Sequence, residues 1–460
     1  MATNLKVQGY VAPGFELVVE AFKENFATGD ELGASFCAYH HGVKVVDIWG
    51  GGDATGGLWR QDTLCNVYST TKALGALCVA ILADRNFIDY EEKVTKYWPE
   101  FGKAGKENLT VATILSHQGG ISGIEESNTK LEPNDWYDHA KICRAIENQA
   151  PLFEPRTANG YHAYIIGFLF AELVRRCDPQ HRTIGQFLKE EVTSKLGADA
   201  FIGCPAEEHH RISPLQGSKP VPGQPQVGLE RFFEEAKKNG TMKLMRAVWA
   251  NPSQRSSSAT TDNKDDMDNI NMQANSKEWR EAEIASVNCQ ANAAGLARIF
   301  AALANGGILD GVRIISKTGI DLATKVEVPH GTRLDLVLGR DAQWARGFMT
   351  SHPSTAQYGP NPGTFGHSGA GGSLVFADRV ANLGVGYVMN QMLSNLNGDP
   401  RSLRLIEALY HCIGQPCTYP TDEKGYPVSG RGQNQEEFGR FKSTVLGDVV
   451  PNRATGSARL

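Results

Sequence analysis

The pattern of apolar positions differs between parts of the chain, and each pattern predicts a different element. Residues 69–87, STTKALGALCVAILADRNF, carry apolar side chains on every side of a helical wheel, which is typical of a helix buried all round. Apolar residues at a helical spacing predict an amphipathic helix at 10–28 and further helices at about 164–176, 291–304 and 400–413. Gly306-Gly307 follows the third of these and favours its end there.

Two other segments have the composition of paired strands. Residues 32–51 predict two strands joined by a tight turn at Gly42, and residues 371–392 predict two more around a turn. Mainly helical sequence separates the two pairs, so the strands of the beginning are expected to share a sheet with those of the end. The predicted fold is therefore α/β (α+β): an antiparallel sheet flanked by helices, with an inserted, mainly helical domain and a cleft between the two.

One large domain is expected over residues 10–415, followed by a polar, Gly-rich tail at 416–460. The parts expected along this domain are the sheet from about 30–50 and 290–415, the helical part at about 66–285 and, inside the helical part, an insertion at about 205–282. The insertion contains QRSSSATTDNKDDMDN, which is polar and lacks aromatic residues, so it is expected to be mobile. A functional lid and an indifferent surface loop both remain open for it.

Composition and charge narrow the possible functions. Of the 460 residues, 41% are hydrophobic and 21% charged, as in a globular protein with a large core. A net charge of −5, a pI near 6.2 and the lack of a Lys/Arg run argue against a nucleic-acid surface. No signal peptide and no membrane span are recognisable, so we expect a soluble, cytoplasmic protein. The alternative address is the peroxisome, because Ala458-Arg459-Leu460 resembles the terminal tripeptide of peroxisomal proteins.

Cysteine and histidine give no sign of a metal site. The nine cysteines are odd in number and include no Cys-x-x-Cys pair, which argues against a disulfide framework or a zinc site. Most fall in apolar segments, as Cys78 does, where a free thiol packs like a small hydrophobe. His40-His41 lies in a predicted turn, and neither it nor His209-His210 has a carboxylate at a metal-like spacing. We therefore expect no metal site.

The strongest chemical signal lies at the start of the helix predicted to be buried. Ser69 and Lys72 are three residues apart, so the two side chains meet on one helix face and the amine can reach the hydroxyl. Free backbone N–H groups at a helix start favour negative charge on the serine oxygen. A second Ser-x-x-Lys, Ser127 to Lys130, lies in polar sequence broken by Pro133 and is expected in an exposed loop. Ser69 and Lys72 are therefore a candidate nucleophile and base, and a plain N-cap serine beside a surface lysine remains the alternative.

The segment DTLCNVY precedes the box Ser69-Thr70-Thr71-Lys72. Three further boxes follow along the chain: ILSHQGGISG, Tyr161 ahead of an apolar helix, and FGHSGAGGSLVFAD. Together they resemble the serine β-lactamase, penicillin-binding-protein and esterase superfamily, most closely its class C-like branch with the family VIII carboxylesterases. The resemblance covers roughly residues 10–413 and implies the β-lactamase/transpeptidase-like fold.

The resemblance implies acyl transfer through a covalent ester on Ser69 Oγ, with no cofactor. Lys72 and Tyr161 would together take the serine proton and pass it to the leaving group. Which of the two is the formal base stays open. Tyr161 can serve as a base if the charge of Lys72 lowers its pKa, because the reference value is near 10.

The third box of the family is usually Lys-Thr-Gly, and the chain contains Lys317-Thr318-Gly319. Ser316 before it has the position of a helix N-cap, so this match is expected to start a helix away from the site. His367-Ser368-Gly369 is expected to be the functional box, on an edge strand lining the cleft. The backbone N–H groups of Ser69 and Ala370 would then form the oxyanion hole.

Two departures from the family pattern favour ester cleavage. Ala163 stands where class C-like β-lactamases have the asparagine of Tyr-x-Asn, and His367 stands where they have lysine. We expect a small-molecule ester or amide as substrate, and no nucleic acid or membrane as partner. The alternatives are a β-lactamase or D-Ala-D-Ala-type peptidase or transesterase, and a catalytically degenerate binding or scaffold protein.

Two other nucleophilic arrangements fit the sequence less well. Residues 366–370 nearly match the Gly-x-Ser-x-Gly elbow of α/β-hydrolases, but Ser368 precedes a predicted strand, whereas an elbow serine precedes a helix. His117 could be considered a triad base, but the resemblance makes it a structural residue of the loop under the site.

Overall fold

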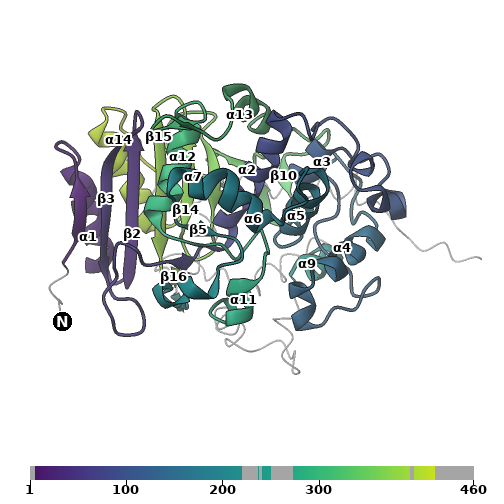
Figure 1. The fold of residues 1–460 in the computed structure, drawn as a ribbon, viewed down its shortest axis with the longest axis horizontal. Helices are drawn as coiled ribbons and strands as arrows, with labels where there is room; N and C mark the ends of the chain where they lie inside the picture. Colours follow the sequence, from purple (N-terminus) through teal and green to yellow (C-terminus); the bar gives the residue numbers. More distant parts are fainter. Residues whose placement is uncertain are drawn as a thin grey trace, which may run out of the picture.

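The computed structural model describes residues 6–219, 237, 241–249, 273–353, 355–393 and 398–419. Its centre is an antiparallel sheet of seven strands in the order β1-β3-β2-β15-β14-β13-β12 (Figure 1). These strands are β1 (Gln8–Val11), β2 (Gly33–His40), β3 (Val43–Gly51), β12 (Met349–Thr350), β13 (Phe365–Ser368), β14 (Leu374–Asp378) and β15 (Leu383–Met389). Cys37 of β2 lies opposite Gly386 of β15, which confirms that the beginning and the end of the chain share one sheet.

One face of the sheet is covered by helix α12 (Ala293–Ala304), which packs against β2, β14 and β15. The close approach depends on a glycine in β15, because a Cβ added at Gly384 would collide with the backbone nitrogen of Ala301. The helix backbone therefore lies directly on the strand.

The opposite face is covered by the terminal helices α1 (Glu16–Ala27) and α14 (Pro400–Cys412), which pack against each other. Side chains alternate along a strand, so Tyr387 of β15 points away from α12. Its hydroxyl donates to Glu31, and Glu31 pairs with Arg401 of α14. This contact fixes α14 to the sheet.

The remaining helices lie beside the sheet and form the mainly helical part (Figure 1). They are α2 (Thr71–Asp84), α3 (Val111–Leu115), α4 (His139–Asn148), α5 (Ile166–Cys177), α6 (Ile184–Leu188), α7 (Ser194–Leu196), α9 (Met242–Trp249), α11 (Lys277–Glu281) and α13 (Lys317–Ala323). All residues of α2 from Thr71 to Ala83 are buried, as predicted. Gly75 lets α5 lie close, because a Cβ there would meet Phe170 Cδ2 at 2.6 Å.

Short elements connect these parts. The 3₁₀ turns are η1 (Tyr68–Thr70), η2 (Val94–Lys96), η3 (Pro99–Gly105), η4 (Pro133–Tyr137) and η6 (Ala206–Arg211), and η5 (Lys189–Thr193) is a π turn. The small sheets are formed by β4 (Cys65–Asn66), β7 (Gln290–Ala291) and β5 (Ala200–Phe201), by β16 (Gln391–Leu393) and β6 (Gln216–Lys219), by β8 (Ile308–Leu309) and β9 (Val312–Arg313), and by β10 (Leu334–Asp335) and β11 (Arg340–Asp341).

The prediction of a helix at 10–28 is wrong for its first residues. Residues 8–11 form β1, which pairs with β3 at the edge of the sheet, and the helix begins only at Glu16. Gly14 separates the two elements with a φ of +91°. A few apolar residues fit either period, so pairing with β3 decides the conformation. The other predicted helices and both strand pairs are confirmed, with boundaries shifted by no more than a few residues.

The expected insertion at 205–282 contains described elements at both of its ends. Strand β6 pairs in parallel with β16, and α9 and α11 are helical. The polar sequence QRSSSATTDNKDDMDN lies outside the described residues, and so do the tail from residue 420 and the terminal tripeptide.

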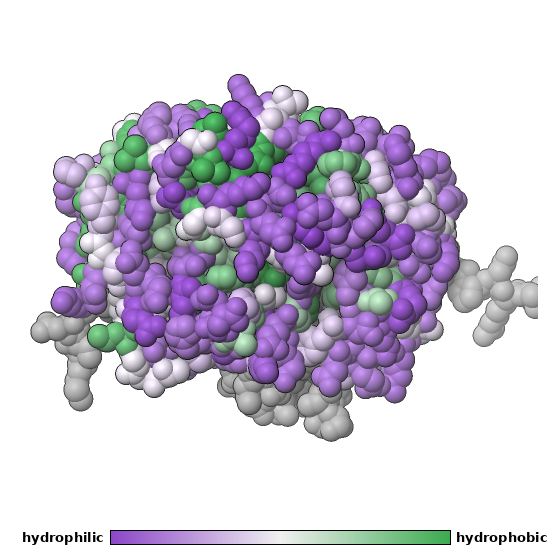
Figure 2. Space-filling view, in the orientation of Figure 1, coloured by the Kyte–Doolittle hydropathy of each residue, from purple (hydrophilic) through white to green (hydrophobic). Residues whose placement is uncertain are grey.

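No helix in the described part of the chain is both long and apolar enough to cross a membrane. On the face drawn in Figure 2, apolar residues lie in small patches separated by hydrophilic ones. All nine cysteines lie within the described ranges, and each is a free thiol. Cys78 is completely buried, as expected of a thiol packed like a small hydrophobe.

Candidate active site

Ser69 lies in the 3₁₀ turn η1, which leads directly into the buried helix α2. The two threonines of its box hold this turn in place. Thr71 Oγ1 accepts a hydrogen bond from the backbone N–H of Cys289 at 3.0 Å, and Thr70 Oγ1 lies 3.2 Å from Ser373 Oγ. Ser69 is therefore presented from a rigid helix start, as its position in the sequence predicted.

Lys72 is completely buried and its amine reaches Ser69. Its Nζ lies 3.0 Å from Ser69 Oγ, 2.8 Å from the carbonyl oxygen of Ala163 and 2.9 Å from that of Ser286. Burial holds the pKa of Lys72 well below its ordinary value. In its neutral form this amine has two N–H groups for the two carbonyl oxygens, which can only accept, and one lone pair that is then left for the serine hydroxyl.

Tyr161 is the third group at Ser69, with its hydroxyl donating to Ser69 Oγ at 2.8 Å. Burial raises the pKa of Tyr161 well above its ordinary value. The condition under which Tyr161 could serve as a base, a pKa lowered by the charge of Lys72, is therefore not met. The physical reason is that burial disfavours the charged form of both groups, so it raises the pKa of the Tyr161 phenol and lowers that of the Lys72 amine.

Aromatic and imidazole rings surround Tyr161. Trp344 stacks on it with ring centres 5.4 Å apart, and His117 lies 5.2 Å away. Nδ1 of His117 accepts a hydrogen bond from the backbone N–H of His162 at 3.0 Å. His117 thus supports the backbone beside Tyr161, which agrees with the structural role expected for it.

Asp335 contributes to the site and was not identified from the sequence. Its buried carboxylate accepts hydrogen bonds from the backbone N–H of Tyr161 at 3.1 Å and from Trp344 Nε1 at 3.2 Å, and also from the N–H groups of Val337 and Leu338. Burial raises its pKa, while these four donors act in the opposite direction. Asp335 therefore places Tyr161 and its stacking partner together. The only signal for it was a charged residue inside the apolar run LDLVL.

His367 of the third box is buried next to Tyr161, with ring centres 6.1 Å apart. Its Nδ1 lies 2.7 Å from the carbonyl oxygen of Ser368, which can only accept, so Nδ1 carries the hydrogen and Nε2 the lone pair. Burial lowers the pKa of His367 to about 3, so the ring is neutral. This box therefore carries no positive charge.

The strand that carries this box is not the edge strand that the sequence analysis expected. Strand β12 pairs with Phe365 and Gly366 of β13 and forms the edge itself. Because β12 is only two residues long, His367 and Ser368 extend beyond its end.

The turn between β13 and β14 is tied to the helix start that carries Ser69. Gly369 N–H donates to Ser373 O at 2.7 Å, and Ser373 Oγ donates to Val67 O at 2.8 Å. A Cβ at Gly369 would collide with Val67 O, so glycine is required there. These contacts bring Ala370, in the same turn, beside the residues that flank Ser69.

The competing sequence matches lie elsewhere or have the wrong geometry. Ser127 and Lys130 are exposed. Lys317-Thr318-Gly319 begins helix α13, where Ser316 Oγ accepts from the N–H of Gly319, which confirms the predicted N-cap. Ser368 ends a strand that turns into another strand, so it is not the serine of an α/β-hydrolase elbow.

The histidine pairs have local contacts. His40-His41 lies at the β2–β3 turn, and His209-His210 lies in η6, where the ring nitrogens hydrogen-bond to backbone carbonyl oxygens.

Among the described residues, His139, Cys143 and Glu172 are close enough to share a metal ion. The Glu172 carboxylate, however, is already paired with two neighbouring arginines, Arg175 and Arg176.

Comparison with known proteins adds to these observations. The model of the beta-lactamase family matches residues 18–409. "Esterase/beta-lactamase LipL" of Mycobacterium tuberculosis is 27% identical over 438 residues, 94% of each chain. Among solved structures, a family VIII carboxylesterase is 43% identical with a TM-score of 0.76, covering 88% of this chain and 100% of that one. A penicillin-binding-protein homologue from Caulobacter crescentus is 37% identical with a TM-score of 0.75 and the same coverage.

Proposed function

This chain belongs to the beta-lactamase family and is a serine hydrolase of an esterase-like kind, and from that premise we propose that it cleaves small carboxylic esters through a covalent acyl-enzyme on Ser69. The family and the fold inferred from the sequence boxes are thereby confirmed. One observation carries the proposal: Lys72 Nζ and Tyr161 Oη both lie within hydrogen-bond distance of Ser69 Oγ, at 3.0 and 2.8 Å.

Lys72 acts as the base in this mechanism. The Ser69 hydroxyl donates to the lone pair of the neutral amine, and the serine proton moves to Nζ as Oγ bonds to the ester carbonyl carbon. The carbonyl electrons move onto oxygen, where the backbone N–H groups of Ser69 and Ala370 stabilise the charge. A donor of this kind commonly contributes about 3 kcal/mol to transition-state stabilisation.

Tyr161 acts on the leaving group. Its phenol is protonated because burial raises its pKa, so it can donate a proton to the alkoxide as the ester C–O bond breaks. The proton that Lys72 took from Ser69 then returns to the phenol oxygen, since both groups lie at Ser69 Oγ, at 3.0 and 2.8 Å. Water then attacks the acyl-enzyme in the same way and releases the acid and the free Ser69 hydroxyl.

Two residues support esters without a negative charge as the substrate class. Ala163 has no side-chain amide to bind a substrate amide and contributes only its carbonyl oxygen to Lys72. The neutral ring of His367 offers a lone pair where a family lysine would offer a charge for a substrate carboxylate. Amides and β-lactams with a carboxylate therefore lose two contacts that a class C-like β-lactamase supplies.

Labelling tests the nucleophile. A fluorophosphonate probe should modify Ser69, as peptide mass spectrometry would show, and Ser69→Ala should lose both the label and ester turnover. Ser127→Ala is the matched control, because it removes the serine of the other Ser-x-x-Lys match and should leave label and turnover intact. Turnover in Ser69→Ala would exclude the mechanism. A wild-type protein that takes no label would favour a degenerate binding or scaffold protein.

A substrate comparison tests the class. Short-chain nitrophenyl esters should be preferred over a chromogenic cephalosporin and over D-Ala-D-Ala peptides by orders of magnitude in kcat/KM. A nitrophenyl monoester that carries a terminal carboxylate should be cleaved more slowly than the uncharged ester of the same length. Because one relative is described as an esterase/beta-lactamase, β-lactam cleavage is the second candidate function. A cephalosporin turned over as well as the best ester would establish it.

A further inference from the structure

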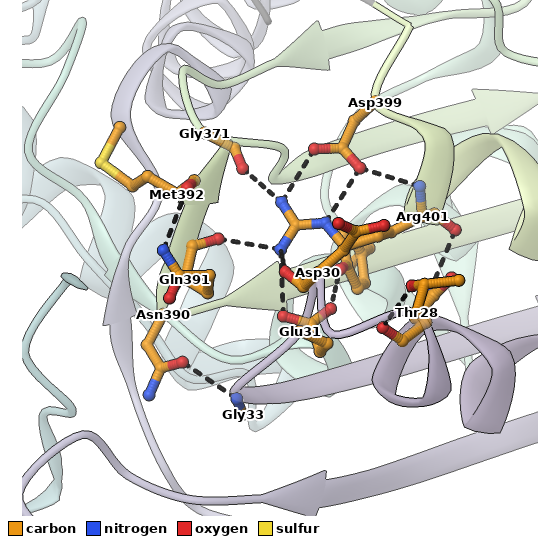
Figure 3. Close-up of polar contacts among 12 residues, drawn as sticks. Thr28, Asp30, Glu31, Gly33, Gly371, Asn390, Gln391, Met392, Asp399 and Arg401 are labelled. Carbon is orange, nitrogen blue, oxygen red and sulfur yellow. Dashed lines mark hydrogen bonds and ion pairs between the residues drawn. The ribbon is translucent and has the colours of Figure 1, made fainter. Parts of the chain in front are cut away.

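A completely buried arginine, Arg401 of α14, lies beside the turn that carries Ala370 (Figure 3). Its guanidinium donates to three backbone carbonyl oxygens: that of Gly371 at 2.5 Å, that of Gln391 at 2.8 Å and that of Asp30 at 3.1 Å. Gly371 is the residue directly after Ala370. The guanidinium therefore holds the carbonyl oxygen of the residue next to Ala370.

Two carboxylates hold the guanidinium of Arg401 in place. Asp399 accepts from Nε at 3.0 Å and from Nη2 at 2.8 Å, and Glu31 accepts from Nη1 at 3.1 Å. Tyr387 donates to the second oxygen of Glu31. All three guanidinium nitrogens are thus engaged, and a buried group with this many partners has one position only.

The turn itself is packed between Arg401 and the start of the nucleophile helix. Gly371 has a φ of +86°, and a Cβ there would meet Met392 Cγ at 2.7 Å. On the other side, a Cβ at Gly369 would collide with Val67 O, two residues before Ser69. A shift of the guanidinium would therefore move the turn relative to Ser69.

We propose that Arg401 is a positioning residue of the oxyanion hole, which fixes the turn 369–372 through the Gly371 carbonyl and so sets the Ala370 N–H relative to Ser69. The inference rests on the proposed function, which assigns the roles of Ala370 and Ser69. An oxyanion donor acts on charge present only in the transition state, so its displacement lowers kcat much more than it alters KM.

Arg401→Lys tests this role while keeping the positive charge. Lysine has three donors on a single nitrogen, so it cannot replace all the hydrogen bonds that Arg401 makes with its three guanidinium nitrogens. For a short-chain nitrophenyl ester we expect kcat to fall about 10²-fold with KM changed less than about threefold. Affinity for an alkyl boronic acid, whose tetrahedral serine adduct puts an oxygen in the oxyanion hole, should fall in parallel. Thermal melting by circular dichroism reports whether the variant folds.

Asp399→Asn is the second variant, used if Arg401→Lys does not fold. Asparagine can still cap α14 but lacks the charge that holds Arg401. The same selective loss of kcat is expected, at about tenfold. A folded variant of either kind with wild-type kcat and boronic acid affinity would overturn the inference, and so would a loss that consists only of a raised KM.

A pair of glycines provides a matched control that leaves the Arg401 cluster intact. Gly371 and Gly363 have similar φ angles, +86° and +80°, but a Cβ at Gly363 meets nothing within 4 Å. Gly371→Ala should therefore lose kcat, and Gly363→Ala should keep the wild-type values. Wild-type kcat in Gly371→Ala would also overturn the inference. None of these results would refute the ester hydrolase itself, which fails instead if Ser69→Ala stays active.

Discussion

At the scale of single residues, burial without counter-charges sets the state of the groups around Ser69. Lys72 contacts two carbonyl oxygens and the serine, so nothing negative offsets the cost of charging it. Burial likewise keeps Tyr161 protonated and His367 neutral. Burial therefore favours the uncharged forms of Lys72 and Tyr161 in the free enzyme. The reaction adds negative charge to the substrate oxygen, and the oxyanion donors act on that charge.

The pH dependence of the reaction follows from the lowered pKa of the amine. Protonation of Lys72 removes the base, so kcat/KM should fall below the lowered pKa of Lys72 and stay level above it. Tyr161→Phe should lose 10²- to 10⁴-fold in rate, as expected when a proton-transfer group is removed, but keep the same acid limb. The measurement is a pH–rate profile of both proteins with a nitrophenyl ester. An acid limb that disappears in Tyr161→Phe would mean that the phenolate is the base.

At the scale of elements, the position of the site depends on helices that lie unusually close to their neighbours. Helix α12 rests on β15 at Gly384, and α2 approaches α5 at Gly75. A Cβ at Gly384 would meet the Ala301 backbone, and a Cβ at Gly75 would meet the Phe170 side chain and the carbonyl oxygen of Ala285. The sheet and the helix start that carries Ser69 meet at β13, which contacts both η1 and α2.

Gly384→Ala measures how much the contact between α12 and β15 contributes to stability. Its Cβ would collide with the Ala301 backbone, which cannot rotate away, so we expect a loss of at least about 3 kcal/mol in the free energy of unfolding. Gly52→Ala is the control, because its Cβ meets Gly57 O only at 3.6 Å, and it should change stability by less than about 0.5 kcal/mol. Urea unfolding followed by circular dichroism gives both values. Equal values for the two variants would contradict this interpretation of the packing.

At the scale of the whole molecule, segments from the beginning and the end of the chain pack against each other. Strand β2 pairs with β15, and the buried Arg401 of α14 joins Glu31, just before β2, to the oxyanion turn. Charge on Glu31 has a net cost in this cluster, since burial raises its pKa to about 7 even beside the arginine.

The pH dependence of stability should show this cost. The pKa of Glu31 rises from 4.5 to about 7 on folding, so the native state binds more protons than the unfolded state between these values. The contribution of Glu31 to the free energy of unfolding is therefore fully present below pH 4.5 and is lost as pH rises through 7. The free energy of unfolding should fall by roughly 3 kcal/mol over this range. Glu31→Gln should remove this slope in urea unfolding at pH 4.5 to 7.5, whereas Glu20→Gln on the surface should retain it. An unchanged slope in Glu31→Gln would show that Glu31 is charged at both ends of the range.

What the sequence alone determined is what depends on near neighbours in the chain. Ser69 and Lys72 meet because three residues make about one helical turn, and the helix between them was recognisable because every side of it is apolar. Ser316 before Lys317-Thr318-Gly319 identified a helix cap by the same local logic. The order of the boxes identified the family.

Only the tertiary structure decided the features that depend on residues far apart in the chain. Pairing with β3 made residues 8–11 a strand, and the short β12 replaced β13 as the edge. Asp335 and Arg401 act on the site through contacts that no spacing in the sequence encodes. The lowered pKa of Lys72 was equally hidden, because a pKa is set by the water removed and the charges gathered around a group, and both are known only once the chain has folded.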